Sequence, residues 1–474
     1  MKVCVLQPDY STSAVDYQNY DPPRDLSGLL PGHQVDHVFL NKLTTHRQLR
    51  QLSTQGYDIF LNLCEGYLDW EVPSVDVIHA LDRLSLPYTG PTAVLYDPSK
   101  PLMKYVAHAA GVPTPAHAVV TALPGLSGAV EALRYPLFVK PAHAGDSLGV
   151  NEASLVRDPA ALPEVVGAVV AGFGEALVEE YVAGREFTVL VLAPVEPGQP
   201  AVALAPVEYR FPPGPPFKTY AHKTSELHPG ANVAVEDAAL AGRLREAAVA
   251  IFRAFGGVGY ARLDFRQGQD GELYFLEINF TCSVFYAHGY QGSADWILEL
   301  DGLGQAGFAR HIIAEGISRH RRRQPPYAVR GNGVAGYGIF ATRALAAGDV
   351  VFRGEGRAQR LVTSRHAAAW PEADQRDFRR YAWPLSDQVF VLWDTDPASW
   401  APQNHSCEAN TGFDGLDVIA LRPIAAGQEL TLDYAAFMNE AAEPFTCRCG
   451  APSCRGTITG TPGNSVTARE QRRR

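Results

Sequence analysis

A run of basic residues followed by two prolines divides this sequence into parts of different texture. Residues 319–326 read Arg-His-Arg-Arg-Arg-Gln-Pro-Pro, and proline both lacks an amide donor and interrupts regular structure. Before the run, β-like stretches alternate with helical ones; after it, the β-like pieces are short and glycine-containing turns separate them. We interpret the run as a solvated linker rather than a nucleic-acid site. The change of pattern across this linker predicts an α/β or α+β N-terminal part and a small, mostly β C-terminal part.

Apolar runs of strand length support this division. In the N-terminal part they are Val3–Leu6, Ile59–Leu63, Leu137–Lys140, Phe187–Leu192 and Tyr274–Ile278. Helical spacing over Ala239–Phe255 ends at two glycines, which is a common helix stop. In the C-terminal part the strand-like pieces are Gly338–Phe340, Val350–Phe352, Val389–Trp393, Val418–Ile419 and Leu430–Leu432. The chain of 474 residues is long enough for two to four domains at about 150 residues each.

Charge and hydropathy exclude several classes of protein. The formal net charge is -10, from 41 basic and 51 acidic residues, which argues against a general nucleic-acid coat. No apolar run reaches the roughly 18 residues that span a bilayer. The apolar stretch that follows Met1 is too short for a signal peptide, and Pro8 and Asp9 end it. These features favour a cytoplasmic protein without nucleic-acid or membrane partners.

Lysines and acids between residues 100 and 223 form a pattern suited to a nucleotide. Lys140 ends a strand, and the small residues that follow it let backbone N–H groups approach phosphate oxygens. Lys100 and Lys223 supply further positive charge. The acids and tyrosine of residues 179–182, with Glu186 beyond them, can hydrogen-bond an adenine edge and a ribose. A strand-end lysine alone is usually just solvated, so the order of these features carries the interpretation.

Two later strands carry oxygen ligands. Alternation places Arg262 and Asp264 on one face of the first strand, and Glu277 and Asn279 on one face of the second. Two carboxylates and an amide oxygen suit Mg²⁺, which bridges nucleotide phosphates. An Asp–Glu pair by itself is often only a surface ion cluster. Combined with the lysines, it predicts an ATP and magnesium site.

Residues 1–312 resemble the ATP-grasp fold, and most closely the D-alanine–D-alanine ligase family. The matching segments are 86–90, Lys100 with 111–115, 138–141, 179–189, Lys223, 259–264 and 275–279. The resemblance implies ATP bound between two lobes, a substrate carboxylate phosphorylated to an acyl phosphate, and attack of an amine to form an amide. It also hints at a homodimer.

The resemblance assigns roles to single residues. By position, the phosphates are held by Lys100, Lys140 and Lys223, the adenine is lined by Glu179, Tyr181 and Val182, and Glu186 holds the ribose. Asp264, Glu277 and Asn279 hold Mg²⁺, and Arg262 stabilises the tetrahedral oxyanion.

The amino-acid end of the pattern departs from the family. The loop after the metal strands reads Phe280-Thr281-Cys282-Ser283-Val284-Phe285, and His288-Gly289 stand where the family has a Ser-Leu pair. The N-terminal loop, residues 9–16, lacks the family's glutamate. We therefore expect an amino acid or peptide other than D-alanine as substrate. His288 is a candidate acceptor contact, whereas Cys64 and Cys282 are expected to be packing residues.

Four of the seven cysteines lie in the C-terminal part. Cys447, Cys449 and Cys454 form one knuckle, which leaves a tetrahedral zinc site one ligand short, and Cys407 can supply the fourth thiolate. The odd total in a large chain argues against a disulfide framework. The pattern therefore predicts structural zinc.

The neighbouring residues resemble SET-domain methyltransferases with a post-SET zinc motif. The carrying segments are 336–338 (Gly-Tyr-Gly), 404–410 (Asn-His-Ser-Cys-Glu-Ala-Asn) and 429–434 (Glu-Leu-Thr-Leu-Asp-Tyr). The resemblance implies short curled sheets and a threaded C-terminal segment. S-adenosylmethionine (SAM) would contact Gly336, Tyr337, Gly338, Asn404, His405 and Tyr434, and Tyr434 would be catalytic. Trp370, Tyr381, Trp383 and Trp393 could line a lysine channel, although most are expected to be core.

The sequence thus predicts a ligase–methyltransferase fusion. Its predicted parts are the ATP-grasp ligase at 1–312, a linker at 313–326, the SET domain at 327–445, the post-SET zinc motif at 446–457 and a flexible tail at 458–474. Expected substrates are amino acids or peptides, and a lysine-containing peptide or protein would accept the methyl group. One alternative is a protein-lysine methyltransferase whose ATP-grasp domain only binds a ligand. Another, a peptidoglycan D-alanine ligase with an accessory SET module, is disfavoured by the altered loop.

Overall fold

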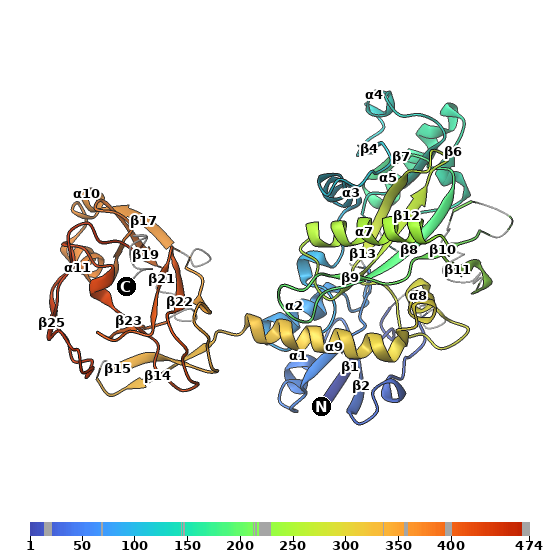
Figure 1. The fold of residues 1–474 in the computed structure, drawn as a ribbon. Helices are drawn as coiled ribbons and strands as arrows, with labels where there is room; N and C mark the ends of the chain where they lie inside the picture. The colour runs from blue at the N-terminus through green and yellow to red at the C-terminus, as the bar shows by residue number, and fades with distance from the viewer. Residues whose placement is uncertain are drawn as a thin grey trace. The chain divides into compact units, whose positions relative to one another are not determined.

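The computed structural model describes residues 1–13, 21–67, 70–143, 145, 147–211, 213, 216–217, 229–334, 336–354, 359–393 and 401–466. The chain splits into two units, Met1–Arg322 and Arg323–Arg474. Figure 1 draws the first from blue to yellow and the second from orange to red. The first unit mixes helices with sheets, and the described part of the second is mostly strands. The predicted fold class is therefore confirmed for both parts.

A parallel sheet begins the first unit. Its strand order is β2-β1-β3, from β1 (Lys2–Pro8), β2 (Gln34–Leu40) and β3 (Ile59–Asn62). The central strand β1 is buried along almost its whole length. Helices α1 (Thr45–Leu52) and α2 (Val75–Arg83) pack against one face of the sheet. The loop after β1 therefore starts at the carboxyl edge of this sheet, where α/β proteins commonly bind ligands.

A four-stranded antiparallel sheet carries Lys140, one of the three predicted phosphate lysines. Its order is β4-β7-β5-β6, from β4 (His117–Val120), β5 (Leu137–Pro141), β6 (Leu155–Val156) and β7 (Ala176–Glu180). Helices α4 (Leu126–Val130) and α5 (Leu162–Phe173) contribute to its core. Lys140 stands near the end of β5 and Glu179 on the adjacent β7.

The largest sheet of the first unit has one apolar face and one face that is apolar at one end and polar at the other. Its path is β11-β10-β8-β12-β13, with β9 beside β8. The strands are β8 (Arg185–Leu192), β9 (Val202–Ala203), β10 (Val207–Tyr209), β11 (Asn232–Ala234), β12 (Tyr260–Gln267) and β13 (Leu273–Asn279). Helices α3 (Lys100–Ala109) and α7 (Ala238–Ala254) pack on the apolar face.

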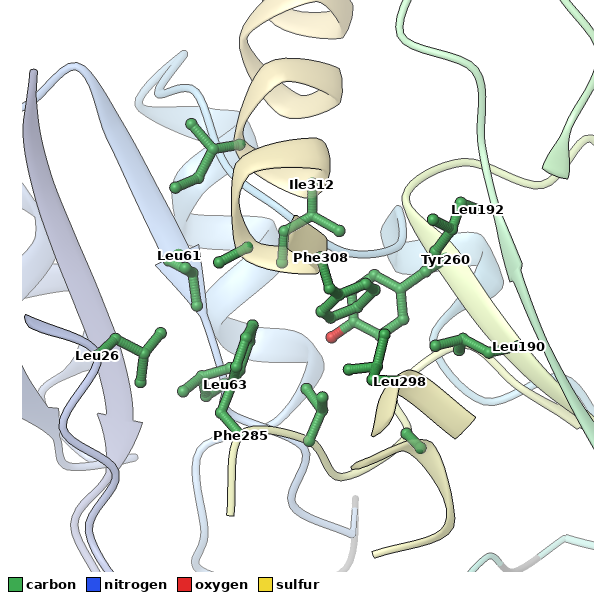
Figure 2. Close-up of a cluster of buried hydrophobic side chains, with 14 of the residues drawn as sticks. Leu26, Leu61, Leu63, Leu190, Leu192, Tyr260, Phe285, Leu298, Phe308 and Ile312 are labelled. Carbon is green, nitrogen blue, oxygen red and sulfur yellow. The ribbon is translucent and has the colours of Figure 1, made fainter. Parts of the chain in front are cut away.

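The other face changes from apolar to polar along the strands, because alternate residues of a strand share a face. At one end, Leu190, Leu192 and Tyr260 join a buried cluster with α8 (Ser293–Asp301) and α9 (Gly304–Arg323). Figure 2 shows Phe308 and Ile312 of α9 between these residues and Leu61 and Leu63 of the N-terminal sheet. At the other end the same face carries the predicted ATP and magnesium residues. The buried cluster at one end of this face thus holds in place the strands that carry the polar residues at the other end.

Helix α9 corrects the predicted linker. It continues to Arg323, so most of residues 313–326 is helix and only 324–326 separates it from the next strand. Ile312 and Ile313 are buried, and Glu315 Oε1 pairs with Arg319 Nε at 3.2 Å. Basic side chains also suit a helix C-terminus. Within the described residues, no helix combines the length and the apolar character that crossing a bilayer requires.

The second unit is built from small sheets. Strands β14 (Tyr327–Asn332) and β15 (Gly336–Ala341) form a hairpin. The main sheet has the order β16-β22-β21-β23-β20, from β16 (Val350–Phe352), β20 (Asn404–His405), β21 (Thr411–Asp414), β22 (Asp417–Ala420) and β23 (Thr431–Leu432). A third sheet, β17-β19-β18, joins β17 (Gln359–Thr363), β18 (Trp383–Pro384) and β19 (Val389–Trp393) near α10 (Ser364–Ala367) and α11 (Glu372–Tyr381).

The C-terminal segment is ordered further than predicted. Strand β24 (Phe445–Thr446) pairs with β25 (Thr457–Ile458), whose Ile458 is buried. Val466 packs into the main core of the unit and donates its N–H to the Pro384 oxygen at 2.9 Å. The predicted flexible tail of 458–474 is therefore wrong for residues 458–466, because Val466 fills a core position. Residues 467–474 lie outside the described part.

Candidate active sites

The two carboxylates predicted to bind magnesium lie directly opposite each other. Asp264 on β12 pairs with Glu277 on β13, and Arg262 pairs with Asn279. Side chains opposite each other in an antiparallel pair have Cβ atoms about 5 Å apart. The Arg262 guanidinium donates to Asp264 through Nε to Oδ1 at 3.3 Å and Nη2 to Oδ2 at 3.1 Å. The structure therefore brings all four predicted residues together.

The surroundings of this pair fit a cation. Asn279 Nδ2 and Thr188 Oγ1 are buried, and neither has a hydrogen-bond partner among the described residues. Thr188 lies opposite Asp264 on the other neighbouring strand. The oxygen and nitrogen of an Asn amide are assigned rather than observed, so a turned amide would place Oδ1 where Nδ2 is now. That oxygen, with Asp264 and Glu277, forms a donor set suited to Mg²⁺.

Two lysines hold Glu179 between them. Lys140 Nζ lies 2.5 Å from Glu179 Oε1, and Lys104 Nζ lies 2.7 Å from Oε2. Although burial acts to raise the pKa of Glu179, the two ammonium groups dominate and lower it from 4.5 to about 2. Burial lowers the pKa of Lys104 from 10.5 to about 8. Sequence reasoning missed Lys104, although its spacing of four from Lys100 places both on one face of α3.

Replacing Lys104 with methionine should destabilise the first unit. Removing one partner of a buried ion pair costs about 3–5 kcal/mol, because the other charge stays buried; we expect the lower end, since Lys140 remains. The stability that ionised Glu179 provides is present above pH 4.5 and lost as the pH falls toward 2, so acid unfolding should begin at higher pH in the variant. Urea unfolding across this range measures both effects.

A matched control is Lys2→Met. Lys2 Nζ lies 3.9 Å from Asp36 Oδ2, and both side chains are partly exposed, so this change should cost about 1 kcal/mol or less. Equal losses for the two variants would contradict the importance of the buried Lys104 charge.

Glu186, assigned to the ribose by resemblance, takes part in a buried network around Arg266. Arg266 Nη2 lies 2.9 Å from Glu186 Oε2, while Nη1 donates to the Tyr181 hydroxyl at 2.7 Å and to the Val182 oxygen at 2.9 Å. Arg266 was missed, although it continues the alternation of Arg262 and Asp264 on β12. The structure therefore brings Tyr181, Val182 and Glu186 together around one arginine, whereas Glu179 pairs with the two lysines. The contacts of these four residues with a nucleotide stay predictions.

Of the other two predicted phosphate lysines, the structure describes Lys100 but not Lys223. Lys100 is the first residue of α3 and is buried, and its N–H donates to the Ala142 oxygen at 3.0 Å. Because Ala142 follows the strand of Lys140, this contact ties Lys100 to the predicted phosphate loop. Lys223 lies outside the described residues.

The amino-acid end contains a network that sequence reasoning missed. Asp21 Oδ1 accepts from the Tyr286 hydroxyl at 2.7 Å and pairs with Arg24 Nη2 at 2.8 Å, and the Tyr10 hydroxyl donates to Oδ2. A cavity of about 270 Å³ lies beside it, lined in part by Tyr10, Asp21 and Phe39. The N-terminal loop and the loop after the metal strands therefore meet here. Such long-range contacts leave no local signal in a sequence.

The structure also places His288, Cys64 and Cys282, the other residues discussed for the amino-acid end. His288 is exposed, with Nδ1 3.0 Å from Gln291 Nε2. Cys64 and Cys282 are buried, and burial raises the pKa of Cys282 to about 12. Both cysteines are therefore packing residues, as expected. Of the predicted N-terminal loop, residues 14–16 lie outside the described part.

In the second unit, four cysteines converge. The sulfurs of Cys407, Cys447, Cys449 and Cys454 all lie within 4.8 Å of one another. All four are free thiols rather than disulfides. Backbone N–H groups point at the sulfurs, from Cys449 to Cys447 at 3.4 Å and from Arg455 to Cys407 at 3.4 Å. Such donors suit thiolates, so the cluster fits a tetrahedral zinc ion.

The residues predicted to bind SAM meet at one edge of the unit. Asn404 Nδ2 donates to the Tyr337 oxygen at 2.9 Å and to Glu429 Oε1 at 2.8 Å. A Cβ added to Gly338 would lie 2.3 Å from Glu429 Oε1, so a larger residue would displace the Glu429 side chain from Asn404. Gly336 has a φ of +88°, which also favours glycine. Glu429, the first residue of segment 429–434, was not predicted to take part, and its carboxylate joins this segment to Asn404.

Tyr434 is partly buried among aromatic rings, and a hydrogen bond orients its hydroxyl. The hydroxyl donates to the Gln403 oxygen at 2.6 Å, and the backbone N–H donates to His405 Nδ1 at 3.1 Å. Phe437 and Phe445 lie within 6 Å of its ring, centroid to centroid. Burial raises the pKa of Tyr434 to about 12. The group is therefore a neutral hydroxyl at neutral pH, and sequence reasoning missed its partner Gln403.

Two of the four predicted channel aromatics, Trp370 and Trp383, are packing residues. Trp370 contacts Phe378 in a small satellite core, and Trp383 packs against Phe413 and Phe437. Tyr381 is exposed. The side chain of Trp393 lies outside the described part.

Comparisons with known proteins follow the same division. A family model described as D-ala D-ala ligase C-terminus matches residues 108–285, and one described as SET domain matches residues 336–435. The D-alanine–D-alanine ligase of Bordetella petrii is 32% identical over 241 residues, which covers 50% of this chain and 70% of the relative. That of Herminiimonas arsenicoxydans is 32% identical over 253 residues, covering 49% and 69%.

Solved structures agree on the fold of the first unit. The D-alanine–D-alanine ligase of Bacillus anthracis in complex with ATP aligns with a TM-score of 0.50 at 19% identity, covering 68% of this chain and 99% of that one. The ligase of Coxiella burnetii gives 0.50 at 17% identity, covering 68% and 96%. The first unit therefore has an ATP-grasp-like fold.

Proposed function

The chain belongs to the D-alanine–D-alanine ligase family through its first unit and carries a SET domain in its second, and we propose that it is a bifunctional enzyme. The first activity is an ATP-dependent carboxylate–amine ligase, and the second a SAM-dependent amine N-methyltransferase. The observation that carries the ligase is the cross-strand pair Asp264 and Glu277, with the unpaired amide nitrogen of Asn279 beside it. The intact donor set favours an active ligase over an inert ligand-binding domain.

In the ligase, each residue has a distinct task. Asp264, Glu277 and Asn279 would hold Mg²⁺, which neutralises phosphate charge when bound. Lys100 and Lys140 place positive charge at the phosphates, and Lys223 is proposed to join them. Arg262 stabilises the oxyanion formed when an amine attacks the activated carboxylate. The product is an amide or peptide bond.

The substrates of the ligase are proposed from its amino-acid end. The network of Tyr10, Asp21, Arg24 and Tyr286 fills the region between the N-terminal loop and the loop after the metal strands. Because these loops depart from the family pattern, we propose an amino acid or peptide other than D-alanine. The test is a panel of amino acids and dipeptides with ATP and Mg²⁺, followed by phosphate release and product mass. Release with D-alanine alone would contradict the proposal.

In the SET domain, SAM is proposed to bind at Gly336, Tyr337, Gly338, Asn404 and His405. The methyl acceptor is an amine, in a lysine side chain of a peptide, a protein or the ligase product. Desolvation of the amine beside Tyr434 would disfavour its charged form and so lower its pKa. SAM would supply the methyl group: the methyl–sulfur bond would break as the nitrogen–methyl bond forms, and the new ammonium group would lose its proton to solvent.

The alternative proposal is a methyltransferase whose first unit only binds a ligand. The two proposals differ in one measurement: the ligase releases phosphate in the presence of substrate amino acids, whereas a binding module shows saturable ligand binding without phosphate release. Free thiols suit a reducing compartment, which supports a cytoplasmic location for either. A homodimer and the absence of nucleic-acid partners stay predictions.

Cys449→Ser should remove zinc and impair methyl transfer before ligation. Four thiolates within 4.8 Å of one another would bind about one zinc per chain. Since structural zinc contributes directly to folding, losing a ligand should loosen residues 445–458 and leave the first unit intact. Metal content by mass spectrometry, with both activities, measures this. Wild-type protein purified without chelators that contains no zinc would contradict the prediction, and Cys282→Ser is the control.

A further inference from the structure

His405 lies between the cysteine cluster and Tyr434. Its Nε2 is 3.4 Å from Cys407 Sγ, and its Nδ1 accepts the backbone N–H of Tyr434 at 3.1 Å. A neutral imidazole has one donor and one acceptor nitrogen. Because Nδ1 accepts, Nε2 carries the hydrogen and donates it to the sulfur. The tautomer of His405 is thus fixed by the Tyr434 contact. Asp433 Oδ1 is 3.8 Å from Nδ1, beyond hydrogen-bond range.

Arg455 makes a second connection between the same groups. Its backbone N–H donates to Cys407 Sγ at 3.4 Å, and its guanidinium pairs with Asp433. Asp433 in turn accepts the N–H of Ala435 at 3.2 Å and so caps the short turn that carries Tyr434. The Cys407 sulfur therefore contacts two residues, His405, which contacts Tyr434, and Arg455, which pairs with the adjacent Asp433.

We propose that His405 and Arg455 are positioning residues that couple the metal at Cys407 to the placement of Tyr434. This inference rests on the proposed methyl transfer. With zinc bound, Cys407 is a thiolate at a fixed point, and a thiolate is a better hydrogen-bond acceptor than a thiol. Both connections then hold Asp433 and Tyr434 in place. Without the metal, Cys407 loses its fixed position and the hydroxyl of Tyr434 moves relative to the Gln403 oxygen.

The first readout is spectroscopic and needs no catalysis. In cobalt-substituted protein, His405→Phe removes the hydrogen bond to Cys407, so the thiolate-to-cobalt charge-transfer band should shift. Zinc release to a chelator should accelerate by about 10–100-fold in His405→Phe, which loses a hydrogen bond to a metal ligand. The acceleration should be smaller in Arg455→Gln, which keeps its backbone N–H to Cys407 and loses the ion pair with Asp433. Arg448→Gln is the control, since Arg448 lies in the same loop with an exposed side chain. His405→Gln, which can donate and accept, should restore part of the wild-type behaviour and guards against a misfolded phenylalanine variant.

The second readout follows Tyr434 itself. With 3-fluorotyrosine at position 434, the ¹⁹F signal should shift on metal removal and in the His405 and Arg455 variants, but not in Arg448→Gln. Where methyl transfer is active, the turnover rate of Arg455→Gln should fall while its SAM affinity stays near wild type, whereas His405→Phe should lower both, because SAM is proposed to bind at His405. Unchanged cobalt and ¹⁹F spectra would overturn the coupling, as would a wild-type protein without metal. Shifted spectra in a protein that methylates nothing would instead support the coupling and overturn the methyltransferase proposal.

Discussion

Glu277→Gln should reduce amino-acid-dependent phosphate release by about 10²–10³-fold, while methyl transfer stays near wild type. Glu277 lies directly opposite Asp264, so the change removes one of the two carboxylates that face the proposed metal. The glutamine keeps the size of the side chain and one oxygen. The loss therefore reports charge at the metal and phosphates rather than packing. Phosphate release at saturating ATP and Mg²⁺ measures it.

Glu272→Gln is the matched control. Glu272 stands in the turn between the same two strands, and its exposed carboxylate lies 3.8 Å from the Arg243 guanidinium. This change should leave phosphate release unaltered, since exposed pairs contribute about 0–1 kcal/mol. If Glu277→Gln lowered both activities together in a folded protein, two independent active sites would be the wrong description.

Local periodicity explains which site residues could be predicted. The pairing of Asp264 with Glu277 follows from the two-residue repeat of neighbouring strands. Lys104 and Arg266 obey the same repeats, at four residues from Lys100 and two from Asp264. They were missed because a buried charge is recognised by its partner, and Glu179 and Glu186 are 75 and 80 residues away in the sequence, respectively.

The two corrected boundaries have a common cause. Both the basic run at 319–323 and the polar stretch at 458–466 have the composition of exposed, irregular segments. Tertiary contacts nevertheless order both segments. Arg319 donates to the backbone oxygen of Tyr88 at 2.8 Å, and Asn464 donates to the backbone oxygen of Ala435 at 2.9 Å. A few anchored residues thus order segments whose composition indicates a linker or a tail. Composition alone cannot identify the partners that supply these anchors.

Tyr434→Phe should lower the rate of methyl transfer by about 10²–10³-fold, the usual effect of removing one preorganised polar group, with SAM affinity near wild type. The hydroxyl donates its hydrogen to the Gln403 oxygen at 2.6 Å, so its lone pairs are left to face the amine and the methyl group. Burial raises the pKa of Tyr434 to about 12. The neutral group therefore orients the amine and does not remove its proton as a phenolate would.

The variant separates orientation from packing. Phenylalanine keeps the ring that lies against Phe437 and Phe445, and the backbone N–H still reaches His405. Calorimetric SAM binding beside methyl transfer to the ligase product, free lysine and lysine peptides distinguishes the steps. Because the proton must leave the amine before attack, the remaining rate should rise with pH in both proteins, with the same midpoint. A midpoint that moved with the substitution would make Tyr434 part of the deprotonation, and a variant with near-normal turnover would remove it from the mechanism.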